Sequence, residues 1–225
     1  MNRIRTALLL ALLAVPACEG EDEPSPAPSP PGSTVVAALG DSITAGSPRW
    51  DPNPDVRDQI GSQLDSRSQY ELWAERALPG TDFRNCGVSG QLTEEIARRL
   101  EDCADGADVL IIQGGTNDIG SGRAPPEIAT NLRGMVREGK RLGLRVAIVE
   151  LLPWNASYPA ADPLIRDVNR RIARIAREEG VRLLPWYRLL EDPQRPGRMR
   201  DAWTDDLLHP SVAGYRRLGE SVELP

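Results

Sequence analysis

Three residues, Ser42, Asp206 and His209, carry the side chains that an acyl-transfer site needs: a hydroxyl, a carboxylate and an imidazole. Ser42 follows a short apolar run that ends at a glycine, a context that presents a hydroxyl on a tight turn after a strand. A serine hydroxyl is a poor nucleophile unless a neighbouring base takes its proton, and His209 is the only histidine in the chain. Asp206, three residues earlier, can accept the other ring N–H and fix the tautomer. These residues therefore predict a nucleophile, a base and an orienting carboxylate.

Two other carboxylates, Asp41 and Asp205, adjoin these residues in the sequence, and a third, Asp118, lies in a separate polar segment. Asp205 is one residue further from His209 than Asp206 is, and in an extended segment its side chain points to the opposite side. We therefore expect Asp205 to face solvent or to bind backbone N–H groups. Asp41 and Asp118 are expected to brace loops as hydrogen-bond acceptors rather than to take part in the chemistry.

An alternation of apolar runs and amphipathic segments must position these side chains. The apolar runs predict five strands, at 34–39, 82–86, 108–113, 144–151 and 181–184. Helical spacing predicts helices at about 91–102, 126–142 and 163–179, and a last helix from 210 to about 222. This order predicts an α/β protein, a three-layer α/β/α sandwich around a five-stranded parallel sheet. In such sheets ligands bind outside the carboxyl ends of the strands.

Four polar blocks stand where three of these strands end and the last helix begins. They are G-D-S-I-T at 40–44, N-C-G-V-S-G at 85–90, G-G-T-N-D at 114–118 and D-D-L-L-H-P at 205–210. Taken alone, each block has an ordinary structural interpretation: Ser42 can cap a helix, Gly87 can form a turn and His209 can be a structural partner. All four at one predicted sheet edge favour a catalytic site over four coincidences.

The four blocks resemble those of the SGNH (GDSL) hydrolase family, over roughly residues 34–222. The resemblance implies the flavodoxin-like SGNH hydrolase fold and catalysis by Ser42, Asp206 and His209. It also implies an oxyanion hole formed by the backbone N–H groups of Ser42 and Gly87 and by the side-chain amide of Asn117. Within the family the chain looks most similar to the lysophospholipase/thioesterase-like acyl hydrolases.

The start of the chain indicates export. Two arginines precede an apolar stretch at 7–15 that is too short to cross a bilayer, so residues 1–17 are predicted to be a signal peptide. The sequence V-P-A-C at 15–18 resembles a bacterial lipobox, in which the cysteine is acylated. Lipidation of Cys18 would make the protein a membrane-anchored lipoprotein of the cell envelope, whereas simple cleavage after Ala17 would secrete it. The Pro-rich, acidic residues 18–33 then form a tether, and residues 34–225 form the hydrolase domain.

The composition narrows the range of partners. The 225 residues carry a formal net charge of −6 without a recurring basic block, which disfavours nucleic acid. One histidine and three scattered cysteines argue against a Cys/His zinc site, so we expect neither metal nor cofactor. No G-x-x-x-x-G-K or G-x-G-x-x-G motif follows a strand, which argues against nucleotide binding.

Cys86 and Cys103 are the two cysteines of the predicted domain. Export would permit a disulfide between them. A straight helix of about eleven residues between them would span roughly 16 Å, far beyond the limit of about 7 Å between Cα atoms. A shorter or tilted helix would bring them closer, so the sequence leaves both states open.

The sequence gives fewer indications of the substrate than of the catalytic residues. Four tryptophans fall in loops predicted at the carboxyl edge, and a fifth falls in a helix: Trp50, Trp154, Trp186 and Trp203, and then Trp73. The polar stretch 46–66 has no periodicity and the length of a lid or binding loop. A rim of tryptophans at this edge would suit an acyl chain, a sugar or an aryl group. Alternatively, the tryptophans only pack the loops together.

The predicted function is hydrolysis of carboxylic acyl esters of short-chain, aryl or lysophospholipid type. Two alternatives stay open: a carbohydrate O-acetylesterase, and a non-catalytic glycan-binding module on the same fold. The predicted partners are small-molecule, lipid or glycan esters, and the membrane only through the lipid anchor.

Overall fold

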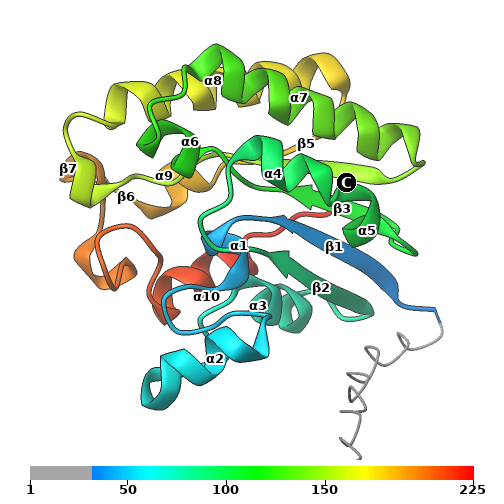
Figure 1. The fold of residues 1–225 in the computed structure, drawn as a ribbon, viewed down its shortest axis with the longest axis horizontal. Helices are drawn as coiled ribbons and strands as arrows, with labels where there is room; N and C mark the ends of the chain where they lie inside the picture. The colour runs from blue at the N-terminus through cyan, green and yellow to red at the C-terminus, as the bar shows by residue number, and fades with distance from the viewer. Residues whose placement is uncertain (1–31) are drawn as a thin grey trace, which may run out of the picture.

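The computed structural model describes residues 32–225, so the predicted signal peptide and Cys18 lie outside the described residues. Five strands form one parallel sheet in the order β2-β1-β3-β4-β5. Their bounds are Thr34–Gly40 for β1, Thr81–Gly87 for β2, Val109–Ile112 for β3, Arg145–Val149 for β4 and Arg182–Leu184 for β5. Helices cover both faces of this sheet (Figure 1). The predicted three-layer α/β/α sandwich is confirmed.

One helical layer consists of α4 (Thr93–Arg98), α5 (Leu100–Ala104), α7 (Pro125–Arg141) and α8 (Asp162–Glu179). Successive side chains of a strand point to opposite faces of the sheet, and Leu39, Leu110 and Ile148 point into this layer. The long helices α7 and α8 turn their apolar stripes toward the sheet, as the spacing of the sequence predicts.

The opposite layer consists of α3 (Tyr70–Ala77), α9 (Trp186–Leu190) and α10 (Val212–Glu220). Val36, Ala38 and Ile111 point into it from the strands. Trp186 does not line a rim of the site, one of the two alternatives that the sequence leaves open for it. Its side chain is fully buried in this layer, where its ring meets Tyr70 edge-on with centroids 4.8 Å apart, because Trp186 is the first residue of α9, which packs there.

The cysteine pair forms a disulfide, with Cα atoms 6.0 Å apart. The expected single helix at 91–102 is broken at Arg99, whose backbone leaves the helical conformation, so α4 and α5 are separate short helices. This break removes the long straight spacer that set the two cysteines apart. Cys103 therefore lies on α5 against Cys86 at the end of β2.

The stretch 46–66 is not without secondary structure. It contains α2 (Pro54–Ile60), followed by a 3₁₀ turn at Gly61–Gln63. Asn53 accepts a hydrogen bond from the Asp55 N–H and Pro54 occupies the first turn, which are ordinary helix-start signals. Two short strands, β6 (Glu191–Asp192) and β7 (Arg195–Met199), form a separate hairpin. Among residues 32–225, no helix has the length and apolar character needed to cross a bilayer.

Candidate active site

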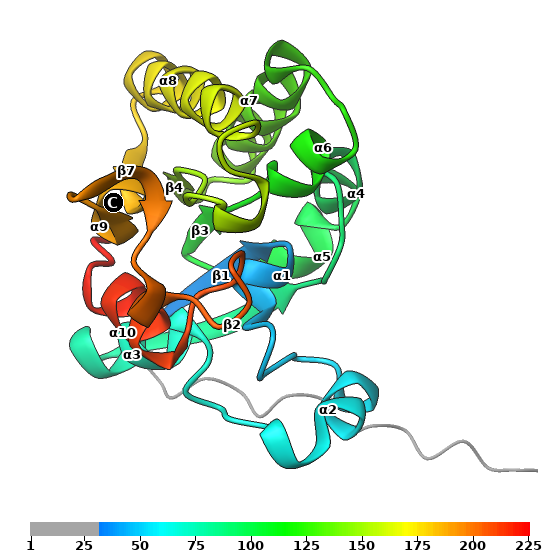
Figure 2. The same ribbon diagram turned by 90° about the vertical axis from the view of Figure 1, so that its left-hand side faces the viewer.

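The predicted catalytic residues meet at the carboxyl edge of the sheet. Ser42 is the first residue of α1 (Ser42–Ala45), directly after β1, and His209 lies in the loop before α10. His209 Nε2 lies 2.9 Å from Ser42 Oγ, and His209 Nδ1 lies 2.6 Å from Asp206 Oδ2. Figure 2 shows the loop that precedes α10 beside α1. Two segments separated by more than 160 residues thus bring a hydroxyl, an imidazole and a carboxylate into one hydrogen-bonded row.

The turn that carries Ser42 is held by buried polar groups. The Asp41 carboxylate accepts a hydrogen bond from the Ile43 N–H at 2.9 Å, and Gln113 Oε1 accepts from the Asp41 N–H and from Thr44 Oγ1. Burial raises the pKa of Asp41, and the hydrogen bond from the Ile43 N–H opposes that rise. Asp41 therefore caps and braces the nucleophile turn, as predicted.

The turn that carries His209 is organised by Asp206. One carboxylate oxygen, Oδ1, accepts hydrogen bonds from the N–H groups of Leu208 and His209, while the other accepts from the imidazole. Burial raises the pKa of Asp206, but these hydrogen bonds from His209 and Leu208 outweigh it and leave the pKa below its ordinary value. The carboxylate is therefore held in its charged form, the form that stabilises an imidazolium.

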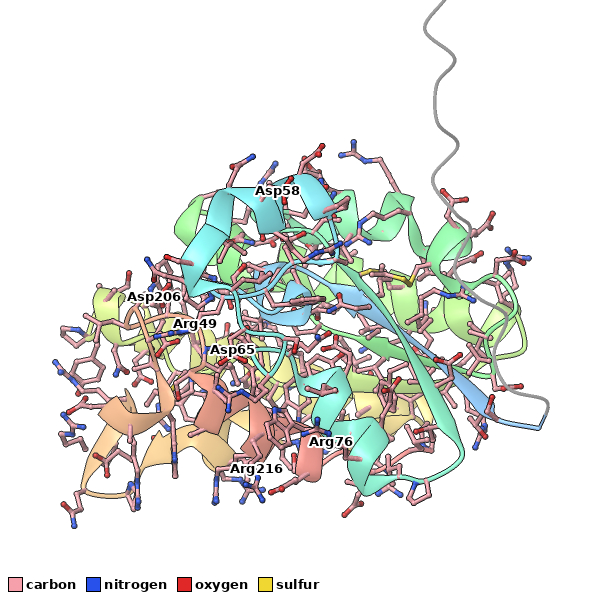
Figure 3. The ribbon with its side chains drawn as sticks, turned by 90° about the horizontal axis from the view of Figure 1, so that it is seen from below. Arg49, Asp58, Asp65, Arg76, Asp206 and Arg216 are labelled. Carbon is pink, nitrogen blue, oxygen red and sulfur yellow. A yellow bond between two sulfur atoms is a disulfide. The ribbon has the colours of Figure 1, made fainter. Side chains whose placement is uncertain are left out.

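Asp205 has a partner that the sequence did not reveal. Its Oδ2 accepts a hydrogen bond from Arg49 Nε at 2.7 Å, and the two side chains form an ion pair. Asp205 is exposed, as expected, but its carboxylate binds an arginine rather than only water or backbone N–H groups. Figure 3 shows Arg49 with Asp206 on one side and Asp65 on the other. Arg49 belongs to the segment after α1, so its distance in sequence hid the pairing.

The predicted oxyanion donors differ in what they already bind. As the first residue of α1, Ser42 has an N–H with no acceptor in its own helix. Asn117 lies in α6 (Thr116–Gly120), and its Nδ2 donates to the Gln91 carbonyl at 3.0 Å, which orients the amide and leaves a second N–H. The Gly87 N–H, in contrast, donates to Asn85 Oδ1 at 2.9 Å.

Gly87 has a different role from the one predicted. A Cβ at this position would lie 2.0 Å from the Ala45 nitrogen, so glycine is needed for β2 to approach α1 closely. Gly90, in the same loop, has a φ of +81° and open space around it. Its N–H makes no hydrogen bond within residues 32–225. Gly90 is thus the glycine of this block whose N–H is available to a ligand.

Arg99 is a further residue that sequence reasoning missed. Its guanidinium donates to the Gly40 carbonyl at 2.6 Å, to the Cys86 carbonyl and to Gln91 Oε1 at 2.6 Å. It therefore joins the end of β1, just before Ser42, to the end of β2 and to the residue that orients Asn117. Burial lowers the pKa of Arg99, and the nearby Asp41 carboxylate opposes that change.

The remaining loops complete the surroundings. Asp118 accepts hydrogen bonds from the Thr93 N–H at 2.9 Å and the Thr93 hydroxyl at 2.6 Å, so it braces α6 against α4, as predicted. The Trp154 ring lies 3.3 Å from the position that a Cβ on Gly120 would take, which places it over the end of α6. Trp50 and Trp203 are stacked with arginines, Arg57 in the first case and Arg200 and Arg217 in the second.

Comparison with known proteins agrees with this geometry. The sequence profile of the GDSL-like Lipase/Acylhydrolase family matches residues 38–217. A lipolytic protein of the G-D-S-L family from Desulfitobacterium hafniense DCB-2 has a similar structure, with a TM-score of 0.68 at 18% identity, over 84% of this chain and 97% of that chain.

Two further solved structures are similar. AlinE4, described as an SGNH-hydrolase family esterase, gives a TM-score of 0.59 at 25% identity over 84% of this chain and 93% of its own. TesA gives a TM-score of 0.63 at 22% identity over 84% of this chain and 95% of its own. No curated protein matches in sequence. With the profile match extending over most of the domain, the chain belongs to the GDSL-like lipase/acylhydrolase family of SGNH hydrolases.

Proposed function

We propose that the protein hydrolyses carboxylic acyl esters through an acyl-enzyme on Ser42. The observation that carries this proposal is the hydrogen-bonded row from Ser42 Oγ through His209 to Asp206, with separations of 2.9 Å and 2.6 Å. These distances lie within the range in which a base takes a proton from a nucleophile. The likeness to AlinE4, an SGNH-hydrolase family esterase, supports the same chemistry.

In the proposed first half-reaction, Ser42 Oγ bonds to the ester carbonyl carbon while its proton passes to His209 Nε2. The carbonyl oxygen becomes an oxyanion, and Asp206 stabilises the imidazolium. His209 Nε2 then gives that proton to the leaving oxygen as the ester C–O bond breaks. The products of this half are a free alcohol and an acyl-enzyme.

In the second half-reaction, His209 takes a proton from water as the water oxygen bonds to the acyl carbon. The tetrahedral intermediate collapses, the bond to Ser42 Oγ breaks and the proton returns to that oxygen. The carboxylic acid is released and the hydroxyl is restored.

The oxyanion needs donors in both halves, and we propose the Ser42 N–H, the Asn117 side chain and the Gly90 N–H for this role. A single side-chain donor of this kind contributes about 10²–10³ in rate in other hydrolases. Gly90 takes the place of Gly87 because the Gly87 N–H is bonded to Asn85 and the Gly90 N–H is not bonded within the domain. A structure of the enzyme with a phosphonate on Ser42 would show which N–H groups contact the phosphonyl oxygen.

For the rest of the chain we propose export and lipidation, with residues 1–17 as signal peptide, Cys18 as the acylated residue and 18–33 as the tether. The disulfide between Cys86 and Cys103 supports export, because disulfides persist in oxidising compartments. Residue Thr34 begins β1 at the amino edge of the sheet, whereas Ser42 follows its carboxyl end. An anchor at Cys18 would therefore attach the domain at the edge opposite its site.

A panel of esters tests the proposed function. Wild type should hydrolyse activated esters from acetyl to longer acyl chains, and Ser42→Ala should not, while its unfolding transition stays that of wild type. The acyl profile then decides between the lysophospholipase/thioesterase type and a carbohydrate O-acetylesterase, which would prefer acetyl groups on sugars. Binding of glycans without hydrolysis of any ester would contradict the proposal and support a binding module.

A further inference from the structure

Leu207, the residue after Asp206, is the only non-glycine residue with a positive φ, +70°, in the part of the chain that the structure describes. A bulky L-residue in this region is sterically disfavoured. The backbone conformation has a local reason, since the turn lets Asp206 accept hydrogen bonds from the Leu208 and His209 N–H groups. Glycine would form the same turn without the steric cost. The turn therefore explains the φ angle and does not explain the leucine.

Burial within the protein does not explain the leucine either. Leu207 is 51% exposed, more than any other large hydrophobic residue of the described chain. Its backbone is fixed, because its carbonyl accepts a hydrogen bond from the Ala156 N–H at 3.0 Å. The side chain thus stands on a fixed turn and leaves about half of its surface in water. Contact with a molecule outside the chain would offset the cost of the backbone conformation.

The position of Leu207 indicates which molecule that is. It lies in the turn that holds His209, whose Nε2 is 2.9 Å from Ser42 Oγ. In the proposed reaction this same Nε2 delivers a proton to the leaving oxygen, so the oxygen of the released alcohol must come within hydrogen-bond reach of His209. The oxyanion points elsewhere, toward the Ser42 N–H and Asn117. The part of the substrate nearest to Leu207 is therefore the alcohol.

Two further apolar residues lie near this turn or near the proposed oxyanion donors. The 154–156 segment, which the Leu207 carbonyl binds, carries Trp154, and that ring lies over the end of α6. On the oxyanion side, Val88 is 41% exposed and its N–H donates to the Gly40 carbonyl, two residues before Ser42. Leu207 and Val88, two exposed aliphatic residues, thus lie within two positions in sequence of His209 and of Gly90 respectively. Apolar groups gain from contact with such side chains, whereas the hydroxyl groups of a sugar do not.

We propose that Leu207 is a specificity-determining residue that contacts the apolar part of the alcohol released by hydrolysis. The inference rests on the proposed function and narrows its substrate class to esters of alkyl or aryl alcohols. Because the proposed contact is with the leaving group, it does not restrict the length of the acyl chain.

Two ester series separate the alcohol from the acyl chain. One series keeps the acetyl group and changes the alcohol from ethyl to butyl to hexyl, which have closely similar leaving-group chemistry. The other keeps ethyl alcohol and changes the acid from acetic to butyric to hexanoic. The variants are Leu207→Ala, which keeps the steric cost, and Leu207→Gly, which removes it. Leu164→Ala, a leucine 40% exposed on α8, is the matched control. Hydrolysis is followed by acid release, and unfolding by denaturant titration.

For wild type and for Leu164→Ala we expect kcat/KM to rise along the alcohol series. Both Leu207 variants should lose about five- to twentyfold on hexyl acetate, a range typical of the loss of a few methylene contacts, with a loss that shrinks toward ethyl acetate. Their acyl series should keep the wild-type slope. The unfolding midpoint of Leu207→Gly should be no lower than that of Leu207→Ala, because glycine relieves the positive φ.

Three results would contradict the proposed role of Leu207, and a fourth would also contradict the proposed function. An equal loss on every ester in both series would show that Leu207 acts only through the turn that holds His209, and a changed slope in the acyl series alone would place it against the acid instead. An unchanged alcohol slope in active Leu207 variants would also overturn the inference while leaving the proposed function intact. Absence of hydrolysis by wild type itself would overturn the proposed function and this inference together.

Discussion

Arg49 and Asp205 form an ion pair, with Nε 2.7 Å from Oδ2, between the segment after the nucleophile helix and the turn that holds the catalytic histidine. A hydrogen bond also holds the segment after the nucleophile helix: the Tyr215 hydroxyl donates to the Ser47 carbonyl at 2.8 Å. Asp205 and Asp206 are adjacent in sequence but serve different partners. One fixes the turn against a neighbouring loop, and the other orients the imidazole.

Because Asp205 and Asp206 bind different partners, the same substitution at the two positions should have unequal effects on kcat. Asp206→Asn should lower kcat by up to about 10⁴, as loss of the orienting carboxylate does in the best-studied triad. Asp205→Asn should lower kcat by much less, because His209 keeps its contact with Asp206. The measurement is kcat for both variants on one activated ester, and equal or reversed losses would show that the wrong carboxylate has been assigned to the imidazole.

Substitution of Arg49, the partner of Asp205, tests the same ion pair from its other side. Arg49→Met should reproduce the small loss of Asp205→Asn, and the double variant should lose no more than either single variant, because both changes break one ion pair. Additive losses would mean that Arg49 and Asp205 act separately.

Arg99 is expected to matter for activity although it lies behind the site. Arg99→Met would remove the donor that Arg99 supplies to the Cys86 carbonyl and one of the two donors to the Gly40 carbonyl, which keeps the Val88 N–H, so the ends of β1 and β2 would lose the side chain that joins them. We expect kcat to fall roughly tenfold or more, since a loss of about 1.4 kcal/mol in transition-state stabilisation corresponds to tenfold in rate, with partial recovery in Arg99→Lys.

The neighbouring arginine is the control for this experiment. Arg98 has a side chain that is 71% exposed and, among residues 32–225, makes polar contacts only with Glu94, through an ion pair at 4.0 Å and a hydrogen bond to its carbonyl, so Arg98→Met should keep wild-type kcat. Equal activity of Arg99→Met and Arg98→Met at equal stability would show that the contacts of Arg99 do not reach the reacting groups.

Much of this arrangement follows from local sequence. Buried strands are short apolar runs, so 34–39 and 108–113 mark β1 and β3 to within one residue at each end. The single histidine and the nearest carboxylate at a suitable spacing left few choices for a base and its partner. The distances between Ser42, His209 and Asp206 agree with that choice.

What the sequence did not show depends on tertiary contacts or on weak local signals. Arg49 and Arg99 find acceptors far along the chain, and no pattern distinguishes them from the many solvated arginines. The break at Arg99 is not marked by proline or glycine, so the sequence predicts one helix in place of α4 and α5 and does not decide whether the disulfide forms. Helix α2 was missed because it buries no side chain and so has no apolar stripe, although Asn53 and Pro54 did signal its start.

The buried carboxyl of Glu71 predicts a pH-dependent stability. Glu71 is 3% exposed in α3, and neither carboxyl oxygen has a hydrogen-bond partner within residues 32–225. Burial raises its pKa well above the ordinary value of 4.5. The stability linked to its protonated form is fully present below that ordinary value and is lost as the pH rises through the raised pKa.

Glu71→Gln should therefore raise the free energy of unfolding at pH 8 and raise it less, or not at all, at pH 4. Denaturant titrations at both pH values measure this. Glu127→Gln, with a side chain 46% exposed, should show no comparable difference between the two. A Glu71→Gln variant that is destabilised equally at pH 4 and pH 8 would contradict the role of the buried carboxyl.

Lipidation of Cys18 is tested by location. Cys18→Ala should move the protein from the membrane fraction to the soluble fraction without loss of specific activity, because the substitution lies far in sequence from Ser42. Fractionation and mass spectrometry of the mature N-terminus measure this. A wild-type protein that is already soluble and begins at an unmodified Cys18 would support secretion instead.

Covalent labelling distinguishes Ser42, the proposed nucleophile, from every other serine of the protein. An organophosphonate ester should inactivate the wild-type enzyme with a stoichiometry of one, and peptide mass spectrometry should find the added mass on Ser42. His209→Ala should slow labelling, because the hydroxyl then lacks its base. Label on a different serine, or a Ser42→Ala variant that still hydrolyses esters and still takes up the phosphonate, would show that Ser42 is not the nucleophile.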